Sequence, residues 1–408
     1  LPALADGARY LIIAPDDYVA DLEPLVEWKT RKGMLATVVP LSQTGYSSVE
    51  IRNFIVDAVT TWDPAPEYVL LVGDQSQLPM ANLQGGYTDT YYGDTDNDTF
   101  IEIHPARFPA QTSTQVQVMV EKTLNYERYP NDDPSFYLDA VLAISEDWDD
   151  DDWVHYYGDA NWESGLMHEA GYQNVDVYTR GTTPDPTGTL TEFLNDGASF
   201  AGFHGQISGT VGWWGFDVVP DNMHNGPMLP IVVSYSCQTV AGASYGGEEW
   251  IRAGSPGDVR GAVAHVGQTI SCSGCAHWRS SLRRGFWGHI FEDTGETDIV
   301  TMAAAVEAGR LHYYHEILST QQYVASNMYG DPELNIWTGM PRELDISHPP
   351  RVPGAAQTPT LSASFEGAAR EGVRICLMGD NGTYAYGLTD ATGCVTFDID
   401  ATDEEILY

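Results

Sequence analysis

The chain has 408 residues, 43% of them hydrophobic, which is enough to bury a core in each of two or three domains. Its 58 acidic and 19 basic residues give a formal net charge of −39, and this excludes nucleic acid as a partner, because binding a phosphate backbone needs clustered Lys and Arg. No apolar run reaches the roughly 18 residues of a membrane span, and no signal peptide begins at Leu1, so we expect a soluble molecule from which any export signal or pro-segment has been removed.

The first part of the chain alternates between short buried strands and helices. Each predicted strand is a continuous apolar run, as in a parallel sheet that is covered on both faces. Gly33 closes the first helix, and Ser47 with Glu50 makes a capping box at the second. We predict strands at residues 10–14, 35–39 and 68–72 and helices at 21–32, 49–62 and 116–129, with a loop rich in Gly, Asp, Asn and Tyr from 73 to about 109.

The alternation restarts after a boundary near residues 131–134. This repetition predicts an α/β fold with two sheet-bearing halves and a doubly wound parallel sheet. In the second half we predict strands at 140–145, 175–178, 199–204, 231–237 and 262–266, and helices at 153–170, 190–194, 248–252, 280–291 and 299–318.

The composition changes beyond Ile336. A linker rich in Pro and Ala at residues 349–359 is followed by short alternating segments and a Gly-Asp-Asn-Gly turn at 379–382. This pattern is typical of a small all-β module, and an immunoglobulin-like sandwich fits it. We therefore predict three domains, at residues 1–132, 133–340 and 341–408.

Two of the predicted strands end at reactive residues. One run ends at His204, followed by Gly205, and another ends at Cys237. Ligands and chemistry gather at the carboxyl ends of parallel strands, so a base and a thiol delivered there together indicate a cysteine-dependent hydrolase. The main-chain N–H groups of Gly205 and Cys237 are candidate donors to the oxyanion.

The five cysteines are too few for a disulfide scaffold. Cys376 and Cys394 could form one bridge in the β module, which the sequence leaves open, and Cys272 with Cys275 forms a CxxC that could bind zinc, form a redox pair or line a pocket. Cys237 is left as the odd thiol, as expected of a nucleophile.

Six segments in chain order resemble the gingipain family of cysteine peptidases, which is family C25 of the caspase-like clan CD. The resemblance covers about the first 340 residues, and the β module stands where that family carries an immunoglobulin-like domain. It implies a caspase-like α/β/α sandwich and endopeptidase activity through a His and Cys dyad with an acidic third residue. The segments are YLIIAP (residues 10–15), EWKTRKG (27–33), YVLLVGD (68–74), ARFP (106–109), YER (126–128) and YGDP (329–332).

By this resemblance the dyad histidine falls on His204 and the nucleophile on Cys237. The acidic residue falls on Asp147, although Glu146 and the run 149–152 compete for that role. A carboxylate there would hold the imidazole tautomer and stabilise the imidazolium.

The resemblance also places the substrate-binding residues. Cys272, Ser273 and Gly274 fall on the wall of the primary specificity pocket, where arginine-specific relatives carry an aromatic residue. Asp152 aligns with an aspartate that binds a basic side chain in those relatives, which favours Arg or Lys at the cleaved position. Trp213 could line the substrate cleft or pack within its loop.

Family members bind structural calcium, which makes calcium the expected cofactor; we expect no organic cofactor. Asp94, Asp96 and Asp98, with Asn97, supply oxygen ligands in one loop. The loop is not an EF-hand, because Thr99 and Pro105 stand where glycine and glutamate are needed.

Together these observations predict a secreted or cell-surface cysteine endopeptidase, monomeric and acting on protein or peptide substrates. Two alternatives remain open. One is a sortase-like transpeptidase of the same fold, which would transfer an acyl group to an amine. The other is a non-catalytic surface adhesion protein that binds through its β module.

Overall fold

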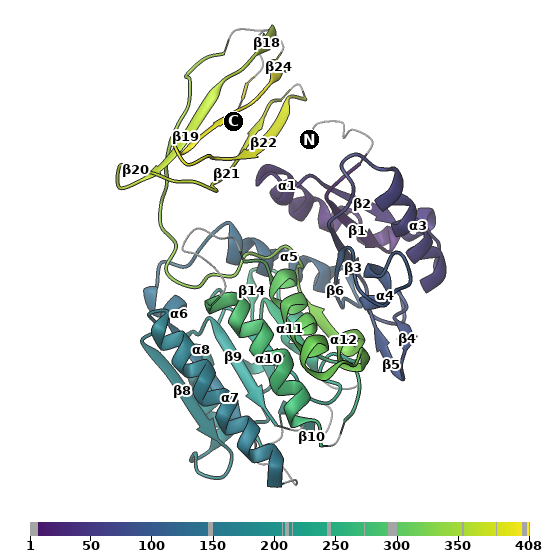
Figure 1. Cartoon of the computed structure of the whole chain (residues 1–408), viewed down its shortest axis with the longest axis vertical. Coiled ribbons are helices and arrows are strands. Elements are labelled where there is room, and N and C mark those ends of the chain that lie inside the picture. Colours follow the sequence, from purple (N-terminus) through teal and green to yellow (C-terminus); the bar gives the residue numbers. More distant parts are fainter. Residues whose placement is uncertain are drawn as a thin grey trace.

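Ten strands form one continuous sheet that runs through the α/β part of the chain (Figure 1). The structure is a computed structural model, and it describes residues 7–145, 150–205, 207–208, 212–213, 215–242, 246–272, 274–292, 300–352, 355–380, 382–401 and 406–407. From one edge to the other, the strands are β2 (Ala36–Pro40), β1 (Tyr10–Ala14), β3 (Tyr68–Val72), β6 (His104–Phe108), β16 (Ser326–Tyr329), β15 (Ala264–Gln268), β12 (Ile231–Ser234), β9 (Phe200–His204), β7 (Asp139–Ile144) and β8 (Asn174–Thr179).

The two predicted halves are joined by β16, which the sequence pattern does not predict. This strand pairs antiparallel with β15 and parallel with β6, so the two halves share one sheet and their strands run in opposite directions. The carboxyl ends of β7, β9 and β12 therefore lie together at one end of the strands, while the carboxyl ends of the strands of the first half lie at the opposite end. The predicted catalytic residues His204 and Cys237 both belong to the second half.

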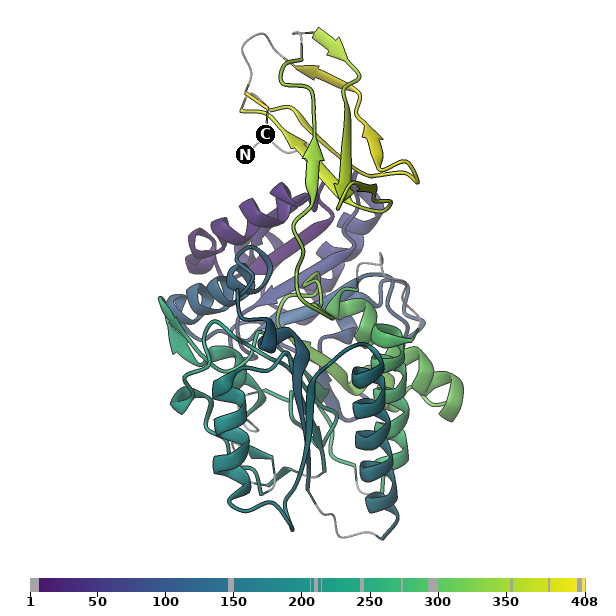
Figure 2. The same ribbon diagram turned by 90° about the vertical axis from the view of Figure 1, so that its left-hand side faces the viewer.

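Helices cover both faces of this sheet, as the view along its edge shows (Figure 2). In β1, β3, β7, β9 and β12, alternate residues enter hydrophobic clusters on opposite faces, as expected for a sheet buried on both sides. One face packs against α3 (Ser48–Thr61), α7 (Asp150–Glu169), α10 (Ala276–Phe291) and α11 (Met302–Ile317), and the other against α1 (Glu23–Arg31), α5 (Ser113–Glu127), α8 (Pro186–Asp196) and α9 (Gly247–Arg252).

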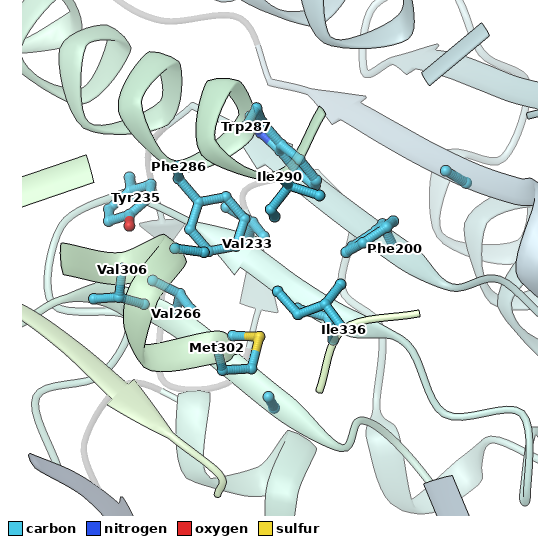
Figure 3. Packing of buried hydrophobic residues seen from close by; sticks show 14 of the residues in the cluster. Phe200, Val233, Tyr235, Val266, Phe286, Trp287, Ile290, Met302, Val306 and Ile336 are labelled. Carbon is cyan, nitrogen blue, oxygen red and sulfur yellow. The ribbon is translucent and has the colours of Figure 1, made fainter. Parts of the chain in front are cut away.

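A hydrophobic core fixes the position of α10 over the sheet. Phe286, Trp287 and Ile290 of α10 lie over Val233 of β12 and Phe200 of β9 (Figure 3). Burial of an aromatic or aliphatic side chain of this kind contributes about 1.5–3 kcal/mol. The register of α10 on β9 and β12 is thus fixed by apolar packing.

Short elements fill the connections. They are α2 (Leu41–Thr44), α4 (Thr90–Gly93), α6 (Pro134–Leu138), α12 (Gln321–Ala325), and the hairpins β4 (Ala81–Leu83) with β5 (Gly86–Thr88), β10 (Ile207–Ser208) with β11 (Gly212–Trp213), and β13 (Gly254–Ser255) with β14 (Asp258–Val259). Among the described residues, no helix combines the length and the apolar character needed to cross a bilayer.

The C-terminal module is all-β, as predicted, and has its own hydrophobic cluster around Leu361, Ile375 and Phe397. In Figure 1 it lies beyond α1. Its strands are β17 (Asp345–Ser347), β18 (Ala355–Gln357), β19 (Thr360–Phe365), β20 (Ala368–Ala369), β21 (Arg374–Met378), β22 (Tyr384–Leu388), β23 (Cys394–Thr396) and β24 (Ile399–Ala401).

The bridge between Cys376 and Cys394 that the sequence left open does not form, and both cysteines are free. Cys376 lies on β21, which pairs with β22, whereas Cys394 lies on β23, which pairs with β19. The two cysteines therefore belong to different strand pairs. Each thiol instead contacts a backbone carbonyl, of Thr30 and Thr392 respectively.

Candidate active site

His204 and Cys237 lie beyond the ends of two neighbouring parallel strands. His204 is the last residue of β9, and Cys237 follows shortly after the end of β12. The two strands pair in register, with Val233 opposite Gly202. The edge where they end is thus the place where the sequence predicts a ligand site.

Hydrogen bonds tie the two strand-end turns together. The Ser236 hydroxyl donates to the Gly205 carbonyl, and the Ser145 N–H donates to the His204 carbonyl at 2.8 Å. Gly205 has a φ of +148°, and a Cβ atom there would lie 2.6 Å from Cβ of Ser145. Only glycine fits this position, because both the backbone conformation and the close approach exclude a side chain.

The N–H groups of Gly205 and Cys237 have no hydrogen-bond partner within the described part of the chain. Main-chain donors left open beside a nucleophile are what an oxyanion hole requires.

The His204 ring is buried, and its two nitrogens differ in their surroundings. Its Nε2 atom lies 3.0 Å from Oε2 of Glu163 and 2.9 Å from Nη2 of Arg283. Its Nδ1 atom has no partner among the described residues. Nδ1 is therefore the ring nitrogen that remains open to exchange a proton.

Glu163 and Arg283 form a buried bidentate pair behind the histidine. Nε and Nη2 of Arg283 donate to the two Glu163 oxygens at 2.6 and 2.7 Å. Burial alone would raise the pKa of Glu163, but Arg283 and His204 outweigh it and lower the pKa to about 2. Burial, and next the charge of Arg283, lower the pKa of His204 below its usual value, while Glu163 opposes them. At neutral pH the site thus holds a carboxylate and an uncharged imidazole.

A second arginine, Arg279, reaches the thiol. Its Nη2 lies 3.0 Å from Sγ of Cys237 and donates to the Cys272 carbonyl at 2.8 Å. Its Nη1 donates to the Tyr156 hydroxyl at 2.9 Å, and the Tyr156 ring lies 6.5 Å from the His204 ring. Arg279 thus places a buried guanidinium against the sulfur atom and links it to the Cys272 carbonyl.

Four residues of this site are not predicted from the sequence, although their spacing along two helices is informative. They are Tyr156, Glu163, Arg279 and Arg283. Tyr156 and Glu163 are seven residues apart on α7, and Arg279 and Arg283 are four apart on α10, so each pair occupies one face of its helix. The two helices pack against each other. In a chain with 19 basic residues, two arginines on the apolar face of a helix point to a buried polar site.

The predicted pocket residues are only partly described. Cys272 is half-buried, forms a disulfide with Cys275 and accepts the Cys237 thiol at its carbonyl, with 3.5 Å between sulfur and oxygen. Gly274 is exposed, with a φ of +66°. Asp147, Ser273 and the side chain of Asp152 lie outside the described residues, although Asp152 belongs to the first turn of α7.

Trp213 packs in the core. Its indole is 3% exposed and stacks on Phe203 and Trp250, with ring centroids 4.8 and 5.4 Å apart. Of the two roles that the sequence allows for Trp213, the structure therefore favours packing over a contact with substrate.

The predicted calcium loop brings together a different set of carboxylates. Ligand atoms of Asp94, Asp96 and Glu102 lie within 4.8 Å of one another. Asp98 is not in this group, and its side chain accepts the Phe100 N–H at 2.8 Å. Glu102 takes the place of Asp98 because the loop between α4 and β6 folds back on itself. Sequence spacing alone does not reveal this fold.

The fold and the sequence both have known relatives. Gingipain R2 from Porphyromonas gingivalis strain W83 is 25% identical over 392 residues, covering 89% of this chain and 50% of the relative. Lys-gingipain W83 from the same species is 24% identical over 428 residues, covering 95% of this chain and 24% of the relative. The chain thus spans about half, or less, of the length of these curated relatives.

A solved structure shares the architecture. The crystal structure of the Arg-specific cysteine proteinase gingipain R matches with a TM-score of 0.85 at 19% identity, over 98% of this chain and 94% of that one. The complex of the RgpB pro- and mature domains from P. gingivalis matches with a TM-score of 0.84 at 20% identity, over 97% and 94%. These two matches confirm that this chain has the caspase-like α/β fold of the gingipains. Because the model for peptidase family C25 also matches residues 3–337, the chain belongs to that family of cysteine peptidases.

Proposed function

We propose that this chain is a cysteine endopeptidase in which Cys237 is the nucleophile and His204 the acid and base. The observation that carries this proposal is the delivery of both residues to one sheet edge by neighbouring parallel strands. Membership of family C25 supports the reaction class.

The proton moves through Nδ1 of His204. Nε2 can donate to Glu163 or accept from Arg283, but not both at once, and the ionised Glu163 favours a hydrogen on Nε2. This tautomer leaves a lone pair on Nδ1, which takes the thiol proton as sulfur bonds to the peptide carbonyl carbon. The imidazolium returns that proton to the leaving amine, and a water deprotonated by His204 then hydrolyses the thioester.

Three further groups stabilise charge along this path. The N–H groups of Gly205 and Cys237 would receive the oxyanion, and Arg279 would stabilise the negative charge that develops on sulfur as its proton leaves. Glu163 takes the part of the acidic third residue that the sequence assigned to Asp147, because it contacts the histidine directly.

We propose cleavage after Arg or Lys, with the Asp152 carboxylate as the partner of the basic side chain and Cys272, Ser273 and Gly274 as the pocket wall. The names of the relatives include an Arg-specific proteinase and a Lys-gingipain. Cleavage-site profiling on a mixed peptide library tests this: enrichment of Arg and Lys supports it, and enrichment of acidic or apolar residues overturns it. Asp152→Asn should reduce the enrichment.

We further propose a secreted or cell-surface monomer whose β module is immunoglobulin-like. We also propose a structural calcium ion held by Asp94, Asp96 and Glu102, since clustered carboxylate oxygens suit that cation. Calcium that raises the melting temperature of the wild type but not of Asp96→Asn would support the site. An equal rise in both would overturn it.

The decisive test replaces the nucleophile. Cys237→Ala should abolish peptide hydrolysis and leave the melting transition nearly unchanged, whereas Cys376→Ala, a matched change at a free cysteine far from the site, should keep activity. Hydrolysis retained in Cys237→Ala overturns the proposal. With an amine nucleophile present, amide products in place of hydrolysed ones would identify a transpeptidase instead.

A further inference from the structure

A cleft of about 800 Å³ opens between the α/β part and the C-terminal module, and neither His204 nor Cys237 lines it. One wall is the end of α1, a second is the segment from Asn335 to Leu344, and the third comes from β19, β21 and the turn before β21. Its volume lies in the range of ligand sites, which is roughly 300–1,000 Å³. None of the residues that line it takes part in the proposed reaction.

The cleft is basic, although the chain as a whole is acidic. Its lining holds five cations and two carboxylates in a protein with 19 basic and 58 acidic residues. The cations are Arg31, Lys32, Arg342, Arg370 and Arg374, and the carboxylates are Glu127 and Glu371. Glu127 is already paired with Lys29 and Lys32, so it does not neutralise the other cations.

Two of the cations lack a carboxylate partner. Arg342 and Arg370 contact the same Phe365 ring, at 5.3 and 5.2 Å from its centroid, and make no ion pair with any described residue. Both guanidinium groups are thus held against one ring with their charges unpaired within the described part of the chain, and a bound anion could pair with them. Arg31, Lys32 and Arg374, by contrast, already pair with Glu27, Glu127 and Glu333.

Two tryptophans supply apolar surface in the same cleft. The indole N–H of Trp28 donates to Glu127 at 2.7 Å, and that of Trp337 donates to the Tyr126 carbonyl at 3.0 Å. Both rings are thus fixed by the fold, and their polar atoms are already satisfied. They offer rigid apolar surface at little cost in conformational entropy.

We propose that this cleft binds an acidic peptide segment of another protein, with carboxylates on Arg342 and Arg370 and apolar side chains against Trp28 and Trp337. Guanidinium groups bind carboxylates through paired hydrogen bonds, and the aromatic walls suit a peptide better than a bare ion. A long polyanion is disfavoured by the net charge of −39, whereas a short segment feels mainly the local cations, because salt screens charges beyond about 8 Å.

Isothermal titration calorimetry on the Cys237→Ala chain, which cannot cut the probe by the proposed mechanism, tests the binding. The probes are a synthetic peptide of alternating Glu and Phe and its counterpart with Gln in place of Glu. We expect the Glu peptide to bind and to weaken as salt rises from 50 to 300 mM, by about tenfold. Equal binding of the Gln peptide would overturn the proposal.

Charge-neutral variants locate the site. The double variant Arg342→Gln with Arg370→Gln should weaken binding at least about tenfold. Arg351→Gln, at an exposed arginine of the linker that does not line the cleft, should not change the affinity. Arg370→Lys should lose less affinity than Arg370→Gln, because the charge remains although the paired hydrogen bonds do not. Unchanged binding by the double variant would overturn the assignment.

Two further outcomes would also overturn it. Inorganic phosphate that displaces the peptide at equal concentration would indicate a site for any small anion. Dimerisation of the chain alone in sedimentation, lost in the double variant, would indicate that a second copy is the occupant. Because the binding is measured without catalysis, failure here leaves the proposed peptidase reaction untouched.

Discussion

Lys29 and Glu127, which are 98 residues apart in the chain, form an ion pair with 2.9 Å between Nζ and Oε2, and the Lys29 side chain is fully buried. Lys29 also lies 2.8 Å from Glu333 and contacts Asp331. Three of the segments that carry the family resemblance, EWKTRKG, YER and YGDP, therefore meet at this one ammonium group. Arg374 of the β module joins the same cluster, 3.1 Å from Glu333.

Lys29→Met should destabilise the chain by about 3–5 kcal/mol, because three buried carboxylates would lose their shared cation. The three carboxylates raise the pKa of Lys29 well above its usual value, against the opposing effect of burial. Urea unfolding at pH 7 measures the loss. Arg31→Gln, which breaks only the exposed pair with Glu27, should cost no more than about 1 kcal/mol. Equal losses in the two variants would contradict a central role for Lys29.

Glu163→Gln should lower kcat by a factor on the order of 10², because the imidazole loses the anion that fixes its tautomer. Glu163 raises the pKa of His204, so its removal should also move the acidic limb of the kcat/KM profile to lower pH. A change that only damaged the fold would not shift that limb. If Asp147→Asn moves the limb and Glu163→Gln does not, the acidic third residue is Asp147.

Arg279→Gln should lower kcat/KM on a peptide substrate by about tenfold, because the guanidinium that contacts Sγ of Cys237 and the Cys272 carbonyl no longer positions the nucleophile. Arg279→Lys should restore part of the rate, since a cation remains. Arg284→Gln, on the same helix but pairing with Asp159, is the matched control and should react as the wild type does. An unchanged rate in Arg279→Gln would remove Arg279 from the proposed mechanism.

The sequence predicts most elements of the sheet because their strands are continuous apolar runs. It does not predict β6 and β16, which contain polar residues. In β6, Arg107 is fully buried because Asp89 binds it through two hydrogen bonds of 2.8 and 2.6 Å. In β16, Asn327 accepts the Asp89 N–H at 3.1 Å. Both strands depend on partners distant in the sequence, and a hydropathy pattern cannot show these.

The same limit applies to the active site. His204 and Cys237 are predictable because each follows a strand, and Gly205 because it follows the histidine. Glu163 lies in the interior of a long helix, where a glutamate is normally exposed. Its contact with His204 arises from the packing of α7 against α10, which places Arg283 beside it. The spacing of Arg279 and Arg283 indicates a buried polar site on α10, but which carboxylate enters that site depends on the packing of the two helices.

Glu248 gives a pH-dependent prediction outside the catalytic residues. It is buried on α9, and burial raises its pKa to about 7 although Arg252 and Arg107 act to lower it. Between its usual pKa of 4.5 and 7, the folded chain holds a proton that the unfolded chain releases. This contribution to stability is therefore complete below pH 4.5 and is lost as the pH rises through 7.

Glu248→Gln, which is neutral at every pH, should be more stable than the wild type at pH 8 by on the order of 1–3 kcal/mol and about equal to it at pH 4.5. Arg252 keeps its hydrogen bond to the Pro109 carbonyl at 2.6 Å, so it retains a partner in the variant. Urea unfolding at the two pH values measures the difference. Glu249→Gln, at the less buried neighbouring residue, should change stability by no more than about 0.5 kcal/mol at either pH. A Glu248→Gln chain that is less stable than the wild type at pH 8 would mean that the ion pair with Arg252 outweighs the cost of burying the carboxylate.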